Sequence, residues 1–246
     1  MTEDIPDIFH CPLTFYHEND NYKNHLSISV YNDQMEEKYL ELLSEQEKKR
    51  YDGYKYHARK KSYLLGRATA KLAIKKLSGS EPQSYDIKSG IFSQPIVEGL
   101  HKNIQVSISH TDITCVSIAY YEQFPVGIDI EKIHQPNIEV IMKILTPYEK
   151  KLVESDEINT FLLWTAKESL GKALRTGITI PLELLEIKTI EKKDGIYHIA
   201  FSNFGQYKSF SFRFKTNIIS VSYPYISKAD NVDLKNIEKL SKNSIS

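Results

Sequence analysis

The chain repeats itself, because four short segments recur in the same order about 100 residues further along. The matched pairs are Leu43-Ser-Glu-Gln-Glu-Lys-Lys49 with Leu145-Thr-Pro-Tyr-Glu-Lys-Lys151, Tyr63-Leu-Leu65 with Phe161-Leu-Leu163, Asp86-Ile-Lys88 with Glu186-Ile-Lys188, and Ile113-Thr-Cys-Val-Ser117 with Ile218-Ile-Ser-Val-Ser222. One short match arises easily by chance, whereas four in one order at a nearly constant spacing indicate a duplication. The sequence therefore predicts two similar halves related by a pseudo-two-fold axis.

Both halves have the same order of elements. A capping residue, Ser44 or Thr146, begins a charged helix, and a second helix rich in aromatic and aliphatic residues follows. Alternating or β-branched segments predict strands at 104–109, 113–121, 197–201, 210–214 and 218–223. Because helices precede strands in each half, we expect an α+β fold in which antiparallel sheets pack with helices. We place the first half at 1–126, the second at 127–226 and a polar tail at 227–246.

Charge is spread unevenly although it sums to zero. The 246 residues include 32 Lys and Arg and 32 Asp and Glu, a balance that argues against binding to nucleic acid or to a membrane surface. Between Lys48 and Lys76, however, eleven Lys and Arg are accompanied by a single acidic residue, Asp52. One segment of the first half is therefore strongly basic, and the rest of the chain is acidic.

The sequence also lacks the marks of several protein classes. No run approaches the roughly 18–20 consecutive apolar residues that cross a bilayer, and the acidic start lacks a signal-peptide pattern. Cys11 and Cys115 form no CxxC pair, which argues against a zinc site or a disulfide framework. The usual phosphate-binding glycine loops are absent. We therefore expect a cytoplasmic protein without a membrane partner.

Two carboxylates stand two residues apart in Gly127-Ile-Asp-Ile-Glu131. On an extended strand Asp129 and Glu131 project from one face, while Ile128 and Ile130 point into the core. Carboxylates held this close repel each other, and a divalent cation is the usual way to neutralise them. A solvated strand face explains the pair about equally well, so this motif alone leaves both interpretations open.

A helix predicted over Trp164-Thr-Ala-Lys-Glu-Ser-Leu-Gly-Lys172 carries two stripes of side chains. One is apolar (Leu163, Ala166, Leu170 and Ala173), and the other is mixed (Trp164, Glu168, Lys172 and Arg175). On an open surface the i,i+4 pair of Glu168 and Lys172 is worth only about 0.3–0.5 kcal/mol. The neighbouring Trp164 indicates a cleft or an interface instead.

A third element closes the strand predicted at 104–109. Ser109, His110 and Thr111 place hydroxyls and an imidazole at the strand end, where they suit a phosphate group. A lone histidine in this position is more often simply a hydrogen-bonded residue.

In this order the three elements resemble the 4′-phosphopantetheinyl transferase superfamily, in particular its Sfp-type members. The family pattern is a Ser-His strand end, then Gly-Ile-Asp-x-Glu, then Trp-x-x-Lys-Glu-x-x-x-Lys, followed by Gly-x-x-x-Pro-Leu. These elements stand here at Ser109-His110, 127–131, 164–172 and Gly177 with Pro181-Leu182, and the resemblance covers about 43–224. The chain departs from the family at Ser93-Gln94-Pro95, where members usually have Gly-Lys-Pro.

The resemblance implies two similar α+β halves with the active site between them. It implies transfer of phosphopantetheine from coenzyme A to a serine of an apo acyl or peptidyl carrier protein, with release of adenosine 3′,5′-bisphosphate. By the same resemblance Mg²⁺ is held by Asp129, Glu131 and Glu168, while Glu168 takes the serine proton and Lys172 assists the leaving phosphate. The candidates for the phosphates of coenzyme A are Lys48, Arg50, Arg59, Lys60, Ser109 and His110. The length and organisation suggest a monomer.

Two other functions stay open. A degenerate relative would hold coenzyme A or a carrier protein without catalysis, which the change at Ser93-Gln94-Pro95 allows and the intact acidic residues oppose. A metal-dependent nuclease would combine Asp129 with Glu186-Ile-Lys188. Because that element recurs as Asp86-Ile-Lys88, we interpret it as part of the fold.

Overall fold

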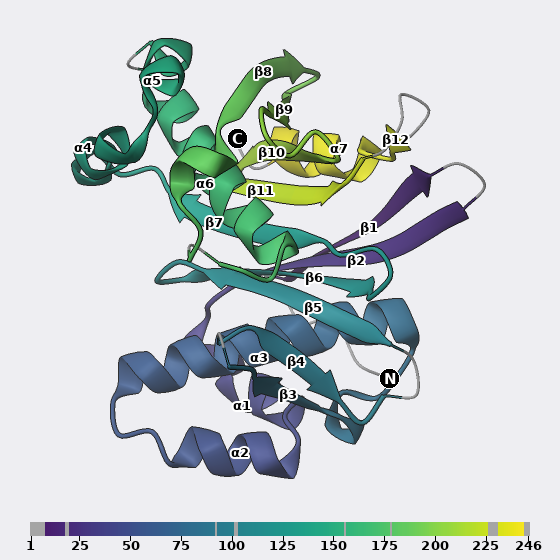
Figure 1. Ribbon diagram of the computed structural model, residues 1–246. Helices are drawn as coiled ribbons and strands as arrows, with labels where there is room; N and C mark the ends of the chain where they lie inside the picture. Colours follow the sequence, from purple (N-terminus) through teal and green to yellow (C-terminus); the bar gives the residue numbers. More distant parts are fainter. Residues whose placement is uncertain are drawn as a thin grey trace. The chain divides into compact units, whose positions relative to one another are not determined.

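The computed structural model describes residues 8–17, 20–91, 93–100, 103–154, 156–177, 179–225 and 231–243 (Figure 1). The chain divides into two compact units, which we call the first unit (Met1–Thr14 and Tyr22–Gln123) and the second unit (Phe15–Asn21 and Phe124–Ser246). Each unit joins helices to an antiparallel sheet, which confirms the predicted α+β class. The short segment Phe15–Asn21 belongs to the second unit, although the sequence placed all of 1–126 in the first half.

The first unit is built on one long helix, α3 (His57–Ser78). The other helical elements are η1 (Asp33–Met35), α1 (Glu36–Glu41), α2 (Glu45–Asp52) and η2 (Pro82–Ser84). Its strands are β1 (Ile8–His17), β2 (Asp20–Val30), β3 (Asp86–Ser89), β4 (Pro95–Glu98), β5 (Ile104–His110) and β6 (Thr114–Tyr121). The sheet runs β1-β2-β6-β5, and β3 and β4 form a separate hairpin. The buried Ala68 and Ala73 have small side chains that allow α3 to pack closely.

The second unit is built on the long helix α6 (Glu157–Ala173). Its other helical elements are α4 (Gln135–Ile144), α5 (Pro147–Val153), η3 (Leu182–Leu185) and α7 (Lys235–Asn243). Its strands are β7 (Gly127–Lys132), β8 (Ile187–Lys193), β9 (Ile196–Phe201), β10 (Tyr207–Phe214), β11 (Asn217–Pro224) and β12 (Asn231–Val232). Five of them form an antiparallel sheet in the order β7-β11-β10-β9-β8, and α6 packs on β7, β11 and β10.

The segment that we expected to be a polar tail, 227–246, is partly folded. Strand β12 pairs with Phe15 and Tyr16 at the end of β1, and α7 packs on β10 with Ile237 fully buried. Leu234 and Leu240 beside Ile237 are half-buried, so a few apolar side chains in a polar stretch hold this short helix on the sheet. Residues 227–230 and 244–246 of the predicted tail lie outside the described residues.

The predicted repeat has a structural counterpart in a helix cap that both units share. Ser44 and Thr146 each begin a helix with a capping box, in which their backbone N–H donates to Glu47 or Glu149 at 3.0 Å. The capping hydroxyls also donate to the first residue of the repeated Asp/Glu-Ile-Lys element, Asp86 or Glu186. This explains why these segments recur together in the sequence. The pseudo-two-fold relation of the halves stays a prediction.

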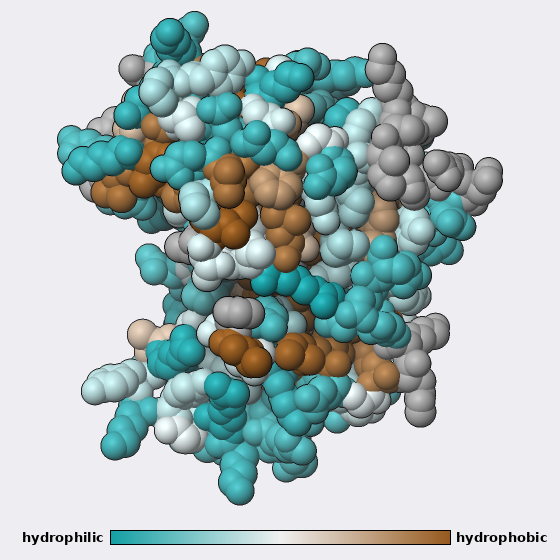
Figure 2. Space-filling view, in the orientation of Figure 1, coloured by the Kyte–Doolittle hydropathy of each residue, from teal (hydrophilic) through white to brown (hydrophobic). Residues whose placement is uncertain are grey.

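Apolar side chains also reach the surface over α4, where hydrophobic atoms gather in Figure 2. Val140 is exposed there, and Ile138 and Met142 are half-buried. Among the helices that the structure describes, none combines the length and the apolar character needed to span a bilayer.

Candidate active site

The strand β7 holds the predicted carboxylates in a buried place. Asp129 lies opposite Ser220 of β11, and its side chain is almost fully buried. Ile128 and Ile130 alternate with the carboxylates and are buried as well. Because β7 is covered on both faces, the interpretation of a solvated strand face is wrong for this motif.

Gly127 brings helix α6 directly onto β7. A Cβ atom at this position would lie 2.0 Å from the Ser169 carbonyl oxygen and 2.5 Å from the Ala173 nitrogen, so only glycine fits. The close approach sets Glu168 and Lys172 beside the carboxylates of β7.

Two contacts join α6 to β7 at this place. Lys172 Nζ lies 2.7 Å from Asp129 Oδ1, and Trp164 Nε1 donates to Glu131 Oε1 at 3.1 Å. The sequence had paired Lys172 with Glu168 along the helix, whereas the structure shows its contact with the strand. We call Asp129, Glu131, Glu168 and Lys172 the acidic cluster.

The predicted stripes of α6 are confirmed. Leu163, Ala166, Leu170 and Ala173 are buried in the core, while Trp164, Glu168 and Lys172 are half-buried at its edge. Arg175, just beyond the helix, is exposed. The Trp164 side therefore forms a partly closed surface, as its composition indicated.

Burial and the crowding of carboxylates together set the electrostatics of the cluster. Burial, followed by the charges of Asp129 and Glu131 and against that of Lys172, raises the pKa of Glu168 to about 7. Burial and Asp129 also raise the pKa of Glu131, against the Trp164 hydrogen bond and Lys172. A carboxylate with a pKa near neutrality suits a general base that works at neutral pH.

The chemistry of the cluster fits a hard divalent cation, since three carboxylate side chains that destabilise one another's charge are neutralised by one. Within the described residues, however, no three His, Cys, Asp or Glu side chains are already arranged as metal ligands. The ammonium group of Lys172 lies beside Asp129 instead. Binding of Mg²⁺ by Asp129, Glu131 and Glu168 stays a prediction.

The first unit contains a pocket of about 370 Å³ on the basic segment. Three of the residues predicted to bind phosphate line it: Arg50, Arg59 and His110. Lys48, Lys60 and Ser109 are not among its lining residues. Lys48 pairs with Glu45 at 3.3 Å, and the ammonium group of Lys60 lies over the ring of Tyr51.

Tyrosine rings and a tyrosine hydroxyl, rather than carboxylates, hold Arg50 and Arg59 in this pocket. Arg59 lies over the ring of Tyr54, and Arg50 donates from Nε to the Tyr54 hydroxyl at 3.3 Å. Within the described part of the chain, neither arginine has a carboxylate partner at ion-pair distance. Their charges are therefore oriented but not neutralised, which suits a polyanionic ligand.

Our reading of the sequence missed Arg67, which lines the same pocket and lies over the ring of Tyr63. The signal was its i,i+4 spacing from Tyr63 within the basic segment. His110 is held by Ser62, whose Oγ lies 3.0 Å from its Nε2. Ser62 was not predicted either, because its contact with His110 joins a helix to a strand far along the chain.

Ser93, where the family usually has glycine, also lines this pocket. Its φ is +63°, a left-handed conformation that glycine adopts without strain. Serine in this conformation therefore carries backbone strain that a glycine would not.

The residues of a nuclease are not brought together in the second unit. Asp129 is on β7 and Glu186 directly precedes β8, and these two strands form opposite edges of the five-stranded sheet. Glu186 accepts hydrogen bonds from Thr146 and Ser202. The Glu-Ile-Lys element is part of the fold, as its repetition indicated.

Comparison with known proteins gives a consistent result. Residues 125–224 match the family model described as the 4′-phosphopantetheinyl transferase superfamily. A 4′-phosphopantetheinyl transferase of Bacillus subtilis is 26% identical over 139 residues, which cover 54% of this chain and 59% of the relative. The 4′-phosphopantetheinyl transferase gsp of Aneurinibacillus migulanus is 32% identical over 102 residues, which cover 39% and 41%. The matches thus span about half the length of these relatives.

Among solved structures, a holo-(acyl-carrier-protein) synthase from Bacillus anthracis in complex with CoA (3′,5′-ADP) aligns with a TM-score of 0.34 and 22% identity. The alignment covers 39% of this chain and 92% of that protein. The family match spans β7 to β11 and so includes the whole acidic cluster. Residues 125–224 of this chain are therefore similar to the 4′-phosphopantetheinyl transferase superfamily, the family that its motifs resemble.

Proposed function

We propose that this chain transfers 4′-phosphopantetheine from coenzyme A to a serine of an apo acyl or peptidyl carrier protein. The observation that carries the proposal is the acidic cluster, in which α6 sets Glu168 and Lys172 beside Asp129 within the family segment. A base with a pKa near neutrality and a cation beside a buried carboxylate are the groups that such a phosphoryl-type transfer needs.

In the proposed reaction Glu168 takes the proton of the carrier serine hydroxyl. The serine oxygen forms a bond to the β-phosphorus of coenzyme A, while the bond from that phosphorus to the bridging oxygen breaks. Adenosine 3′,5′-bisphosphate leaves with the bridging oxygen, and Lys172 stabilises the charge that develops on it. Raising the pKa of Glu168 to about 7 makes it a stronger base than an exposed glutamate.

Asp129, Glu131 and Glu168 are the residues that would hold Mg²⁺. When bound, this ion would act as a Lewis acid that neutralises charge on the pyrophosphate. With the charge of Asp129 neutralised by Mg²⁺, Lys172 would be available to the leaving group.

The pocket of the first unit is assigned to the phosphates of coenzyme A. Arg50, Arg59 and Arg67 line it, each with its guanidinium over a tyrosine ring, and His110 adds a hydrogen-bonding group. Arginine suits this task because its planar group donates two parallel hydrogen bonds to a phosphate. The proposal therefore divides the work: recognition of phosphates in the first unit and chemistry in the second.

A mass-shift assay tests the proposal directly. The protein is incubated with coenzyme A, Mg²⁺ and, in parallel, apo carriers of fatty-acid, polyketide and nonribosomal-peptide type. At least one carrier is expected to gain the mass of one phosphopantetheine. Glu168→Gln is expected to lower kcat by about 10²- to 10⁴-fold.

The controls separate the competing functions. Coenzyme A binding, measured by calorimetry, without transfer to any carrier would favour the degenerate binding protein. Full transfer activity in folded Glu168→Gln or Asp129→Ala would reject the assignment of the acidic cluster. Cleavage of DNA that Mg²⁺ supports and Asp129→Ala abolishes would favour a nuclease.

A further inference from the structure

Two lysines of the described chain are fully buried, and the proposed reaction uses neither. The side chains of Lys71 on α3 and Lys167 on α6 are 0% exposed. An ammonium group withdrawn from water is costly unless a charged partner and further acceptors surround it. Each lysine therefore needs a carboxylate partner and further hydrogen-bond acceptors, and both lysines have them.

In the second unit that environment is centred on Glu149. Lys167 Nζ lies 2.8 Å from Glu149 Oε2 and also donates to the Leu182 carbonyl at 3.1 Å. Glu149 in turn accepts the backbone N–H of Thr146 at the start of α5 and of Ile187 at the start of β8. Lys167 therefore ties α6 to η3 directly, and to the starts of α5 and β8 through the Glu149 carboxylate.

The tie fixes the rotation and the axial position of α6 beside the acidic cluster. Glu168 follows Lys167 directly, and successive side chains of a helix are held about 100° apart. At the Gly127 contact the backbone of α6 already presses against β7. A helix held at both places keeps Glu168 and Lys172 directed at Asp129.

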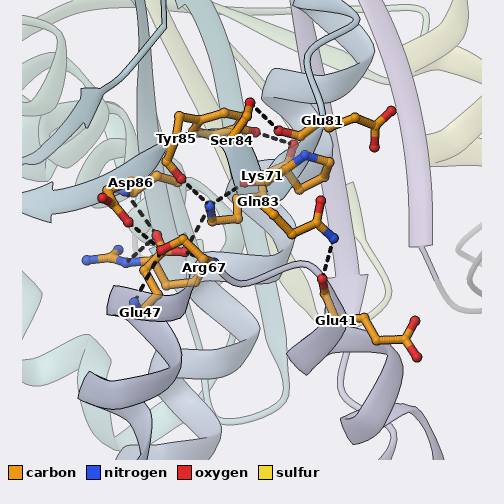
Figure 3. A network of polar contacts seen from close by, with 12 residues as sticks. Glu41, Glu47, Arg67, Lys71, Glu81, Gln83, Ser84, Tyr85 and Asp86 are labelled. Carbon is orange, nitrogen blue, oxygen red and sulfur yellow. Dashed lines mark hydrogen bonds and ion pairs between the residues drawn. The ribbon is translucent and has the colours of Figure 1, made fainter.

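The first unit has the same arrangement around Glu47, which Figure 3 shows from close by. Lys71 Nζ lies 2.8 Å from Glu47 Oε2 and donates to the carbonyls of Pro82 and Tyr85 at 2.6 and 2.7 Å. Arg67, one turn earlier on α3, lies beside the same carboxylate, with its Nε 4.0 Å from Oε1. Here the tie holds the part of α3 that carries Arg67 to the pocket.

We propose that Lys167 and Lys71 are positioning residues with separate tasks. Lys167, through Glu149, orients Glu168 and Lys172 for turnover, and Lys71, through Glu47, orients Arg67 for coenzyme A. Neither lysine touches a reacting atom. The assignment of kinetic roles rests on the proposed function, whereas the structural part stands without it.

The experiment compares two matched variants of the full chain, Lys167→Met and Lys71→Met, with a carrier that the wild type modifies. Lys167→Met is expected to lower kcat about 10-fold or more, with KM for coenzyme A within about 3-fold of wild type. Lys71→Met is expected to raise KM for coenzyme A about 10-fold, with kcat within about 3-fold. Lys167→Arg, which keeps the positive charge, is expected to regain part of kcat.

Lys167→Met removes the ammonium group beside the buried Glu149, and Lys71→Met leaves the buried Glu47 with only Arg67, at 4.0 Å. Paired substitutions therefore guard against loss of folding. Lys167→Met/Glu149→Gln and Lys71→Met/Glu47→Gln remove the charge on both sides. The amide oxygen of each glutamine can still accept one of the two backbone N–H groups that the carboxylate accepts. Circular dichroism and thermal unfolding identify the folded variants. The same split between kcat and KM is expected in the double variants.

The single tryptophan of the chain gives a readout that needs no transferase activity. Because Trp164 donates to Glu131, its fluorescence reports how α6 lies against β7. Lys167→Met is expected to shift the emission maximum, and Lys71→Met is expected to leave it unchanged.

These readouts separate the two ideas. A wild-type chain that modifies no carrier contradicts the proposed function, and the Trp164 comparison then still decides the positioning role of Lys167. Folded variants with unchanged kinetics overturn the inference. The inference is also overturned if both variants change kcat, KM and Trp164 emission in the same way. The Lys167–Glu149 and Lys71–Glu47 contacts would then support the fold as a whole.

Discussion

The long helices α3 and α6 are mounted in the same way but expose different chemistry. Both are tied by a buried lysine to a capping-box glutamate, Glu47 or Glu149. Relative to that lysine, Glu168 of α6 is matched by Leu72 of α3, and Arg67 of α3 is matched by Leu163 of α6. The repeated residues thus build the frame, and the unrepeated ones build the candidate sites. Comparing the two halves of an internal repeat can therefore separate the residues that build the fold from the candidate functional residues.

The largest effect on stability and activity is expected at the close contact between Gly127 of β7 and helix α6 in the second unit. Gly127→Ala would place a methyl group 2.0 Å from the Ser169 carbonyl oxygen, so α6 must shift away from β7. We expect a loss of about 2–3 kcal/mol in the free energy of unfolding and a fall in kcat of about 10-fold or more. Urea unfolding and the mass-shift assay measure both.

Gly66→Ala on α3 is the matched control for stability. A Cβ atom there meets only the Ile108 side chain at 4.0 Å, so alanine is accommodated. We expect no loss, and a gain of up to about 1 kcal/mol, because alanine is the better helix former. If Gly127→Ala is as harmless as Gly66→Ala, the close approach of α6 to β7 does not position the cluster.

A second pair of variants tests the basic pocket of the first unit. Arg59→Ala removes a charge from the pocket of the first unit, and Lys48→Ala removes one from outside its lining. We expect Arg59→Ala to raise the Kd for coenzyme A about 10-fold, and Lys48→Ala to change it by less than about 2-fold. Titration calorimetry at two salt concentrations measures this. Equal effects would mean that net charge alone attracts the ligand.

The acidic cluster should also make stability depend on pH. The pKa of Glu168 is raised to about 7 in the folded chain from 4.5, so the folded state holds this proton more tightly than the unfolded state. With a chelator present, the stability that Glu168 contributes is full below about pH 4.5 and is lost as pH rises to about 7. The loss is about 1 kcal/mol after allowance for solvent screening.

Glu168→Gln is the reference for this measurement, because it cannot titrate. The free energy of unfolding of Glu168→Gln minus that of the wild type should grow between about pH 4.5 and 7 and then level off. A difference that is flat across this interval would show that burial and the neighbouring carboxylates do not raise the pKa of Glu168 in the folded chain.

The smallest effect is expected at the pocket loop of the first unit. Ser93 has a φ of +63°, so Ser93→Gly should relieve strain and raise the free energy of unfolding by about 0.5–1 kcal/mol. Thermal unfolding measures this difference. A loss of stability would mean that the serine side chain contributes more than its backbone strain costs.

Much of the second unit could be predicted because its signals are local. The strands at 197–201, 210–214 and 218–223 and the stripes of α6 follow from short-range periodicity, and the structure confirms them. Strand β2 could not be found in this way. It buries Asn24, Ser27 and Ser29, so its sequence lacks the apolar pattern of a core strand.

The amino-acid sequence by itself determined the α+β class and the order of the motifs, since both rest on residues close together in the chain. It also predicted the duplication, because the repeated segments are short and can be compared directly. Tertiary structure alone decided which charges meet. Lys172 contacts Asp129, and Lys167 is buried against Glu149, although both lysines lie on one short stretch of α6. The physical reason is that burial and partner choice depend on how a helix is pressed against its sheet. That packing is set by residues such as Gly127, far from α6 in sequence.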